Sequence, residues 1–520
     1  MLGRLIAAAA LVLSGLHAPA AANAAVNDTQ SEWLTKYSAL ESQIGHTAYQ
    51  NPDSANLAWN ESYILRSYLD VYSVTGNTAW LDKLVTHTDQ VIADADDLDG
   101  DGYLGWSTAR YSPVELLNPG FETATTGDAT LPANWTRFQD TGTYVYRSTD
   151  VPPDVTGSRS VRIVAGENKW KKLHQTVAST YEGGTRHKLR GWGKRTDQSV
   201  GRIVLRNGTA TVCMLEYTTS TWTYKETVCE MPAGQTYSVW LEHADYTKPG
   251  SAYFDDVKLS GMFPYIVHDG MIGLPMAEFI RLVHQTPALA SYATKAASYR
   301  TFLETEIVPR WQLSSYIGNT WHPIGATEGL YRQSPNFDVF SHTRPSDDLP
   351  YNMPLVFAHL LRVLHSVNSD PAYLDRATRI AHWARNDLTV SGTAYVWNYA
   401  TYTTMKEDLS HANMDLEAFL EFHRRGSVFT ADDMTKLKNT FTTKMWSGTV
   451  TAPEFSRYVD GTPHPSIPHN QDHMDYYLHS WVELAAFDPQ VRTLVVNKYA
   501  NFTPENSGHL ITLSRLLKGA

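Results

Sequence analysis

The sequence predicts a mainly α-helical fold, an α/α toroid of about six helical hairpins, interrupted by an inserted β-sandwich domain. A helix–turn–helix pattern recurs about every sixty residues, and its phase resumes once an insert of about 145 residues is subtracted. Stacked hairpins of fixed period bury a continuous core between neighbours. The paired segments are Ala58–Thr75 with Thr78–Ala93, Met271–His284 with Leu289–Ile307, Asn352–Val367 with Ala372–Leu388, Asn413–Arg425 with Ala431–Met445, and Met474–Ala486 with Gln490–Tyr499. A sixth pair, Ser31–Ile44 with His509–Leu517, would close the ring.

Short polar turns separate the two helices of each pair. Gly76-Asn77 divides the first pair, and Asn368-Ser369-Asp370-Pro371 divides the third. Glycine and asparagine are typical helix-stop residues, and proline is favoured at a helix start. Each apolar-periodic stretch is therefore expected to form two helices that fold back on one another.

The helical period stops inside the insert, between residues 117 and 261. Short β-branched and aromatic runs replace it, each bounded by turn residues, and they are Ser160–Val164, His187–Trp192, Gly201–Leu205, Tyr237–Glu242 and Ala252–Leu259. Many short strands with regular turn signals are typical of a β-sandwich. We therefore divide the chain into a signal peptide (1–25), the first part of the toroid (26–116), the β-sandwich (117–261) and the second part of the toroid (262–520).

The composition indicates an exported protein. Arg4, a short apolar run and the small-residue end Ala22-Asn23-Ala24 are typical of a signal peptide, and no later apolar run is long enough for a membrane helix. A net charge of −11 disfavours nucleic acid as a partner. The only two cysteines, Cys213 and Cys229, lie in the insert, and in an exported protein we expect a disulfide between them across a hairpin. We expect a secreted monomer that does not bind a membrane.

The two ends of the insert carry a family resemblance. Asn118-Pro119-Gly120-Phe121-Glu122 opens it and Phe254-Asp255-Asp256-Val257-Lys258-Leu259 closes it. With the Trp135 segment, these ends resemble the galactose-binding-like carbohydrate-binding modules of secreted glycan-degrading enzymes. The resemblance implies a structural calcium ion held by Glu122 and Asp256, with the oxygen ligands that calcium prefers. Candidate sugar platforms are Trp170, Trp192, Trp222 and Trp240, and a spacer without binding function is the alternative.

Polar segments precede the first helix of several pairs, at the same phase of the repeat. They include Tyr265–Gly270, Asn319–Arg332, Phe340–Asn352, Tyr395–Asn413 and His464–Tyr477. Loops at one end of a rigid scaffold often carry function, so we expect one shared site. Its candidate substrate-binding residues are His268, Trp321, His322, Arg344, Tyr351, Trp397, Tyr399, Tyr402, His473 and Tyr476.

The residue types in these polar segments are suitable for β-elimination from a uronic-acid polymer. That reaction requires a neutralised carboxylate, a base for the neighbouring proton and an acid for the leaving oxygen, and it requires no metal. In these residues the chain resembles the α/α-toroid polysaccharide lyases that cleave alginate and glucuronan. The resemblance implies that Asn352, His411, Arg457 and Tyr458 are the catalytic residues. Relatives space the Arg and Tyr by about two helical turns, which Arg344 and Tyr351 match better than the adjacent pair.

Other interpretations of the same residues stay open. Each residue could also have a purely structural role. Asn352 could serve solely as a helix cap, His411 could serve solely in packing, and Arg457 could pair with a neighbouring acid. A glycoside hydrolase would need two carboxylates, and the candidates are Asp269, Glu328, Asp347, Asp348, Glu407, Asp408, Asp415 and Asp475. A uronate epimerase, a secreted glycan-binding protein without activity, and a metal site drawn from His464, His469, His473 and Asp475 are further alternatives.

Overall fold

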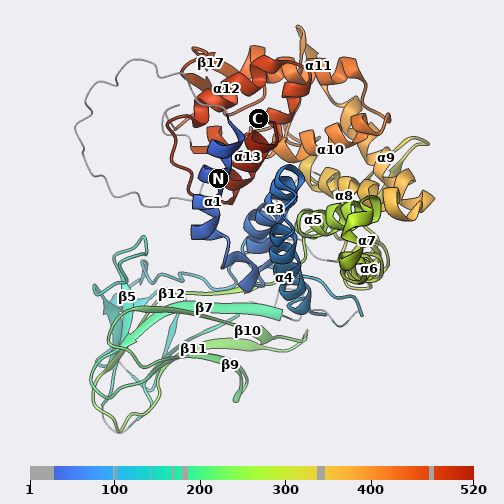
Figure 1. Cartoon of the computed structure of the whole chain (residues 1–520). Helices are drawn as coiled ribbons and strands as arrows, with labels where there is room; N and C mark the ends of the chain where they lie inside the picture. Colours follow the sequence, from blue (N-terminus) through green and yellow to red (C-terminus); the bar gives the residue numbers. More distant parts are fainter. Residues whose placement is uncertain are drawn as a thin grey trace.

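A computed structural model describes residues 29–97, 100, 102–140, 142–166, 169–177, 186–232, 234–336, 346–467 and 473–519 (Figure 1). The expected signal peptide, Arg344 and His469 lie outside these residues, as does the side chain of His473. The protein is a mixed fold in which a two-sheet β-sandwich is inserted between helical regions. In the described part of the chain, no helix is long and apolar enough to cross a membrane.

The helical regions follow the predicted pairing. The helices are α1 (Gln30–Ile44), α2 (Ser54–Asn56), α3 (Ser62–Thr75), α4 (Ala79–Ala93), α5 (Ile266–Gln285), α6 (Ala293–Phe302), α7 (Val308–Leu313), α8 (Asn352–Asn368), α9 (Pro371–Asn386), α10 (Ala412–Arg424), α11 (Ala431–Asn439), α12 (Pro489–Tyr499) and α13 (Ser507–Gly519). Helices α13, α3, α5, α8 and α10 pack against one another in that order. One continuous hydrophobic core includes buried residues from both helical segments, so the two segments form one body around the insert.

Local signals explain the helix boundaries. Gly76 ends α3 with a left-handed backbone (φ 64°), and Ser369 ends α8 in the same conformation (φ 59°). Asp370 then caps α9 by accepting a hydrogen bond from the Ala372 amide, with Pro371 at the first helical position. The residues that make these short-range interactions are recognisable in the sequence. The helix boundaries therefore agree with the predicted ones within a few residues.

One predicted helix, Met474–Ala486, is wrong. The segment instead contains two 3-10 turns, η7 (His473–Tyr476) and η8 (Trp481–Ala486), separated by four residues. Asn413 of α10 explains the break, because its amide donates to the Tyr477 carbonyl (2.8 Å) and its oxygen accepts from the Ser480 N–H (2.9 Å). In a continuous helix, the Tyr477 carbonyl and the Ser480 N–H would bond to other backbone groups of the same helix. Here they bond to the Asn413 side chain, so the helix is interrupted.

The insert forms two antiparallel five-stranded sheets with a separate hydrophobic core between them. The first has the order β10-β7-β12-β5-β4 and the second β3-β6-β11-β8-β9. Their bounds are β3 Thr136–Phe138, β4 Val145–Ser148, β5 Ser160–Val164, β6 Lys172–Thr176, β7 Arg186–Arg195, β8 Gly201–Asn207, β9 Ala210–Tyr217, β10 Thr223–Glu230, β11 Tyr237–His243 and β12 Ser251–Gly261, with a small ribbon of β1 (Ala124–Thr125) and β2 (Asp128–Pro132).

The disulfide between Cys213 and Cys229 is confirmed, but it does not cross a hairpin. Strand β9 pairs with β8 and strand β10 pairs with β7, so the two cysteines belong to edge strands of opposite sheets. The short connection between β9 and β10 passes from one sheet to the other. The disulfide therefore ties the two sheets together along one open edge of the sandwich.

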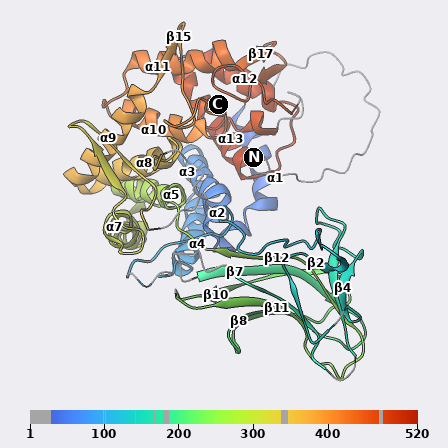
Figure 2. The ribbon, with the colours of Figure 1, turned by 180° about the vertical axis from the view of Figure 1, so that it is seen from behind.

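The chain enters and leaves the insert through paired segments. Thr108 and Phe263 exchange two backbone hydrogen bonds of 3.0 and 3.1 Å. Lys188 of β7 forms an ion pair with Asp53 (3.0 Å), next to α2. The sheet containing β7, β10 and β12 accordingly faces the helical region, and the sheet containing β9 and β11 lies on the far side of the sandwich (Figures 1 and 2).

Candidate functional site

The polar loops before α8 and α10 meet a third loop from residues 457–459. The Glu407 N–H donates to the Trp397 carbonyl (3.1 Å), and the Val459 N–H donates to the Glu407 carbonyl (3.0 Å). The Tyr351 N–H, at the start of α8, donates to the Tyr399 carbonyl (3.2 Å). Three segments that are distant in sequence thus share one small network of backbone hydrogen bonds.

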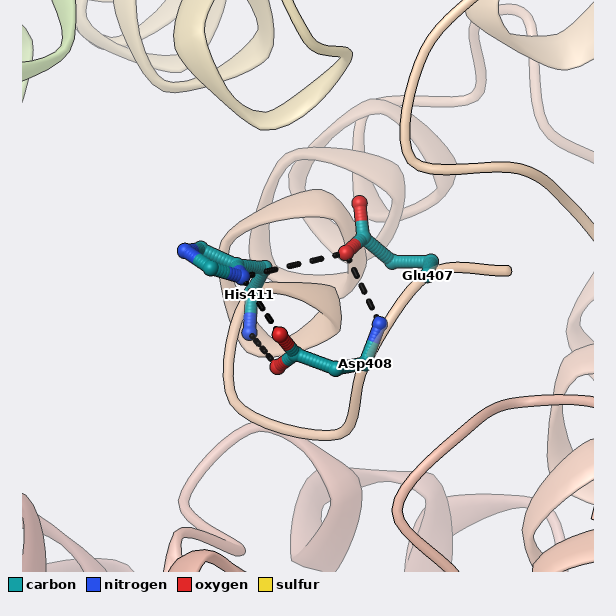
Figure 3. Close-up of side chains that lie close together, drawn as sticks. All are labelled: Glu407, Asp408 and His411. Atoms are coloured by element: carbon teal, nitrogen blue, oxygen red, sulfur yellow. Dashed lines mark hydrogen bonds and ion pairs between the residues drawn. The ribbon is translucent and has the colours of Figure 1, made fainter. Parts of the chain in front are cut away.

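Asp408 and His411 form the centre of this region (Figure 3). His411 Nδ1 lies 2.7 Å from Asp408 Oδ2. The other carboxylate oxygen, Asp408 Oδ1, accepts hydrogen bonds from the Ser410 N–H (2.8 Å), the Ser410 hydroxyl (2.6 Å) and the His411 N–H (3.0 Å). The carboxylate is therefore held rigidly at the start of α10, and it fixes the imidazole.

The charges of this pair stabilise one another. Burial alone would raise the pKa of Asp408, but His411 and then Arg457 outweigh burial and hold that pKa well below its usual range. Burial alone would lower the pKa of His411, but Asp408 outweighs it, and the net pKa is raised. The His411 side chain is 37% exposed, so the ring reaches the surface. An accessible imidazole that favours its protonated form can bind a carboxylate or donate a proton.

Two further carboxyl groups, Glu407 and Asp415, lie fully buried beneath His411. Burial raises the pKa of Asp415 to about 7 and raises that of Glu407 well above its ordinary value. Glu407 Oε1 accepts from the Asp408 N–H (2.9 Å), and Asp415 Oδ2 accepts from the Trp397 indole (2.9 Å). After burial, the charge of Asp415 raises the pKa of Glu407 further, and Glu407 Oε2 and Asp415 Oδ1 have no hydrogen-bond partner among the described residues. The buried pair therefore retains a proton near neutral pH.

Glu407, Asp408 and His411 are also the three metal-ligating groups that lie within 4.8 Å of one another in the described part of the chain. The ligand atoms already have partners: Asp408 binds His411 and two backbone amides, and Glu407 binds the Asp408 amide. This donor set fits a hydrogen-bonded cluster better than a metal centre, because a metal would have to displace these bonds.

The predicted catalytic residues occupy the following positions. Asn352 is the first residue of α8, 1% exposed, and its Nδ2 has no hydrogen-bond partner among the described residues. Arg457 lies in a bend, and the next residue, Tyr458, forms an isolated backbone bridge with Asp408. The Arg457 charge acts on both Asp408 and His411. His411, Arg457 and Tyr458 are thus adjacent to one another.

The predicted substrate-binding residues divide into two groups. Tyr399 lies near His411, with ring centroids 5.5 Å apart, and Trp397 is buried against Asp415. Tyr402 lies in the same loop as Tyr399, between Trp397 and Glu407. The loop thus contributes one aromatic ring directly beside His411.

The other members contact different parts of the fold. Tyr351 donates its hydroxyl to Asp387, and Tyr476 stacks on Phe502 with centroids 3.6 Å apart. His268 is 1% exposed and bonds Ser54 through Nδ1 (2.9 Å). Trp321 and His322 lie in strand β13 (Trp321–Ile324), where Trp321 packs against Arg376 of α9. Within the described part of the chain these side chains contact other elements and not His411, so their role in binding stays a prediction.

The sequence indicates Asp408 only as a candidate hydrolase acid, whereas the structure places it against His411. A usable signal existed, because Asp408 and His411 are three residues apart at a helix start, a spacing that brings side chains together. The signal for Glu407 and Asp415 is weaker, since their pairing depends on the loop turning back over α10.

The expected calcium residues both lie in the sandwich, with Asp256 in strand β12. Glu122 accepts hydrogen bonds from the Ser158 and Arg159 amides (2.9 and 3.0 Å), and Asp256 pairs with Lys258. Asp255 beside them is buried, and burial, with Asp256 and Glu122 nearby, raises its pKa to about 7. The calcium ion stays a prediction for these carboxylates.

Comparison with protein-family models and with curated proteins finds no match. Several solved structures are similar to part of the chain. A family 61 carbohydrate-binding module in complex with β-1,4-galactotriose is 20% identical, covers 28% of this chain and 98% of that chain, and has a TM-score of 0.22. A CBM22-1 xylan-binding domain from Paenibacillus barcinonensis is 15% identical and covers 29% of this chain and 94% of that one, also with a TM-score of 0.22. The enzymatically active domain of tailspike protein 4 of bacteriophage CBA120 is 19% identical, with a TM-score of 0.24; it covers 32% of this chain, which spans 23% of that protein.

Proposed function

We propose that the protein is a secreted polysaccharide lyase that cleaves a uronic-acid polymer of the alginate or glucuronan type by β-elimination at His411. The observation that carries the proposal is the Asp408–His411 pair, held at a helix start beside Arg457 and partly exposed. A cationic imidazole and a guanidinium side by side suit a substrate carboxylate, whose charge must be neutralised as the enolate-like transition state forms.

We also propose that the helical part closes into a toroid, which would give the substrate a concave face. A chain of contacts supports this. Ser54 before α3 bonds His268 of α5, and Gly270 of α5 lies against Val356 of α8. Asn413 of α10 bonds the segment from Tyr477 to Ser480. Tyr477 stacks on His509 of α13 (5.3 Å), and Ser507 of α13 donates to the Trp59 carbonyl (3.2 Å). The helix starts thus follow one another in a circuit.

In this proposal the residues have separate roles. His411 donates Nδ1–H to Asp408, so Nε2–H faces the substrate, and the imidazolium with Arg457 binds the carboxylate. The buried amide nitrogen of Asn352 has no hydrogen-bond partner among the described residues, and it would bind the same group after a shift at the start of α8. A tyrosine then removes the proton next to the carboxylate and returns one to the glycosidic oxygen. Tyr458 and Tyr399 are the candidates, because both lie beside the Asp408–His411 pair.

The burial of three of the eight candidate acids argues against a hydrolase that uses them. A glycosidase needs one carboxylic acid and one carboxylate that both reach the glycosidic bond. Glu407 and Asp415 are fully buried, and Asp269 is buried in an ion pair with Arg310 (3.2 Å). None of the three can touch a sugar without a rearrangement of the site.

A second function, glycan binding by the sandwich, is supported by an aromatic surface on the sheet that faces away from the helices. Trp240 stacks on His174 with centroids 4.2 Å apart, and Phe138 meets Trp240 edge-on at 5.6 Å. Trp170, 39% exposed, lies edge-on to Tyr246 nearby on the same module. Partly exposed aromatic faces are suitable for stacking on sugar rings.

The test is incubation of the full-length protein with alginate, glucuronan, other polyuronates and neutral glycans. Elimination leaves an unsaturated sugar that absorbs in the ultraviolet, whereas hydrolysis releases reducing ends without this absorbance. A rise in absorbance with one polyuronate, lost in His411→Ala, supports the proposal. Reducing ends without absorbance would contradict it, and binding without any cleavage would leave only the glycan-binding function.

A further inference from the structure

Trp59 occupies an unusual backbone segment at the start of the first inner helix. Residues Leu57–Glu61 form η2, one turn of π-helix directly before α3. A π-turn inserts an extra residue into a helix and is found frequently at functional sites. Trp59 is partly exposed there. Its carbonyl accepts a hydrogen bond from Ser507 (3.2 Å), so Trp59 lies beside the start of α13.

Tyr111 holds the indole in place. The Trp59 Nε1–H donates to the Tyr111 hydroxyl (2.8 Å), and Tyr111 belongs to the segment that leads from α4 into the sandwich. Behind them, buried His268 meets Trp59 edge-on (centroids 5.6 Å apart), and Tyr265 meets Tyr111 in the same way (5.5 Å). The Trp59 N–H and the Tyr111 hydroxyl are hydrogen-bonded to each other, and both rings remain partly exposed. They form a rigid aromatic platform.

Arg110 supplies a positive charge beside this platform. Its guanidinium carbon lies 5.7 Å from the Tyr111 ring centroid, and the residue is exposed. Across the described ranges no acid forms an ion pair with Arg110, and Asp53, whose charge also acts on His268, is paired with Lys188. The Arg110 charge also contributes to lowering the pKa of the buried His268 behind the platform, after the larger effect of burial.

A sugar ring and a carboxylate together fit this arrangement. Sugar C–H groups pack on aromatic faces, and a guanidinium binds a carboxylate through two parallel hydrogen bonds. A neutral sugar would use only the platform, and a simple anion would use only Arg110. A uronic-acid residue would use both.

We propose that Trp59, Tyr111 and Arg110 form a subsite for a uronic-acid residue of the polymer, between the sandwich and the His411 site. The subsite rests on the proposed function, because it assumes that the chain binds a polyuronate. It predicts that specificity for charged over neutral sugars depends on Arg110, a residue outside the reacting groups.

The test uses the full-length His411→Ala protein, which prevents turnover, and measures binding by calorimetry. The probes are oligoglucuronate, oligomannuronate and a cello-oligosaccharide of equal length. Adding Arg110→Ala should weaken binding of one uronate probe roughly tenfold, the size expected for a lost charge-assisted contact, and leave the neutral probe unchanged. Arg110→Lys should restore part of the affinity, because it keeps the charge without the two-pronged geometry. Trp59→Ala should weaken binding of charged and neutral sugars alike.

Unchanged uronate affinity in Arg110→Ala would overturn the subsite, as would the absence of uronate binding to the parent protein. The two proposals fail separately. If the wild-type protein releases unsaturated product and Arg110→Ala has unchanged KM, elimination stands and the subsite falls. If no unsaturated product forms but uronate binding requires Arg110, the subsite stands and elimination falls.

Discussion

His411 Nδ1 lies 2.7 Å from Asp408 Oδ2, and this contact decides which nitrogen of the imidazole is available. Because Nδ1 is occupied, only Nε2 can meet a ligand. Because the carboxylate raises the pKa of His411, the ring favours its cationic form over a wider pH range than a free histidine. Asp408 thereby sets both the orientation and the charge of the residue on which the proposed reaction depends.

Replacing Asp408 by Asn tests this relationship. Asn keeps an oxygen for the backbone amides but no longer stabilises the imidazolium, so the pKa of His411 should fall. If protonated His411 binds the substrate carboxylate, activity is present below its pKa and lost above it. The alkaline limb of the kcat/KM profile should therefore move to lower pH in Asp408→Asn. Asp432→Asn, on exposed α11, is the matched control and should leave the profile unchanged. A shift of the acidic limb instead would make His411 the base.

The buried Glu407–Asp415 pair gives a separate prediction for stability. Burial raises the pKa of Asp415 from 3.8 to about 7, so its contribution to stability is fully present below about pH 4 and is lost as pH rises through 7. Asp415→Asn removes this titration while keeping a hydrogen-bonding group of the same shape. The difference between the midpoint of thermal unfolding of the variant and that of the wild type should therefore change in favour of the variant between pH 5 and pH 8. A constant difference across that range would show that the pair does not hold a proton.

Much of the helical architecture could be predicted because its signals are local. The boundary between α8 and α9 depends on Ser369, Asp370 and Pro371, which are adjacent in sequence. The broken segment 477–480 could not be predicted, because its cause is Asn413, more than sixty residues earlier. Cys213 pairs with nearby Leu205, but the sheet to which Cys229 belongs is decided by His187, its partner more than forty residues earlier.

The same distinction applies to the candidate site. Sequence placed Asn352, His411 and Arg457 at the starts of successive repeats, since the repeat itself is visible. The sequence could not show that Tyr351 turns its hydroxyl toward Asp387, because that choice depends on packing against Trp383. The sequence does not indicate the platform of Trp59 and Tyr111, because the two residues are 52 apart and meet only where the insert begins.

The opposite end of the helices holds a network of buried charges whose disruption should be costly. A cavity of about 230 Å³ is lined there by Arg66, Glu417 and Arg515, among other residues. Arg66 and Glu417 are both buried and form an ion pair. Glu417→Ala removes this ion pair from the buried Arg66 and should reduce the free energy of unfolding by about 3 kcal/mol. Glu32→Ala, which removes a pair at the surface, should change it by less than about 1 kcal/mol. Urea denaturation measures both changes. Equal losses of stability in Glu417→Ala and Glu32→Ala would contradict the conclusion that burial makes the Arg66–Glu417 pair costly to break.

Loss of the disulfide should destabilise the sandwich and leave the helical part unchanged. Cys213 and Cys229 close a loop of 16 residues, and the sandwich core is separate from the helical core. In the double variant Cys213→Ser/Cys229→Ser, we expect the sandwich to lose about 3 kcal/mol. Calorimetry should show one transition at lower temperature and the other unmoved. A shift of both transitions together would mean that the two parts unfold as one unit.

The identity of the proton carrier can be decided between Tyr458 and Tyr399. Tyr458 pairs through its backbone with Asp408, and Tyr399 has its ring 5.5 Å from that of His411. Phenylalanine keeps the ring and removes the only group that transfers the proton. Tyr458→Phe should therefore lower kcat by about a hundredfold or more, the usual size of an acid–base contribution, with little change in KM. Tyr402→Phe, in the same loop as Tyr399, is the matched control.

Each outcome of this comparison assigns a role. A large loss of kcat in Tyr399→Phe, with Tyr458→Phe near normal, would make Tyr399 the carrier and leave elimination at His411 intact. Circular dichroism must show an unchanged fold in each variant, since Tyr458 also lies in the turn that supports Asp408. If Tyr458→Phe, Tyr399→Phe and His411→Ala all keep near-normal activity, the reaction takes place elsewhere. The acid-pair hydrolase would then be the better interpretation, because it alone needs none of these three side chains.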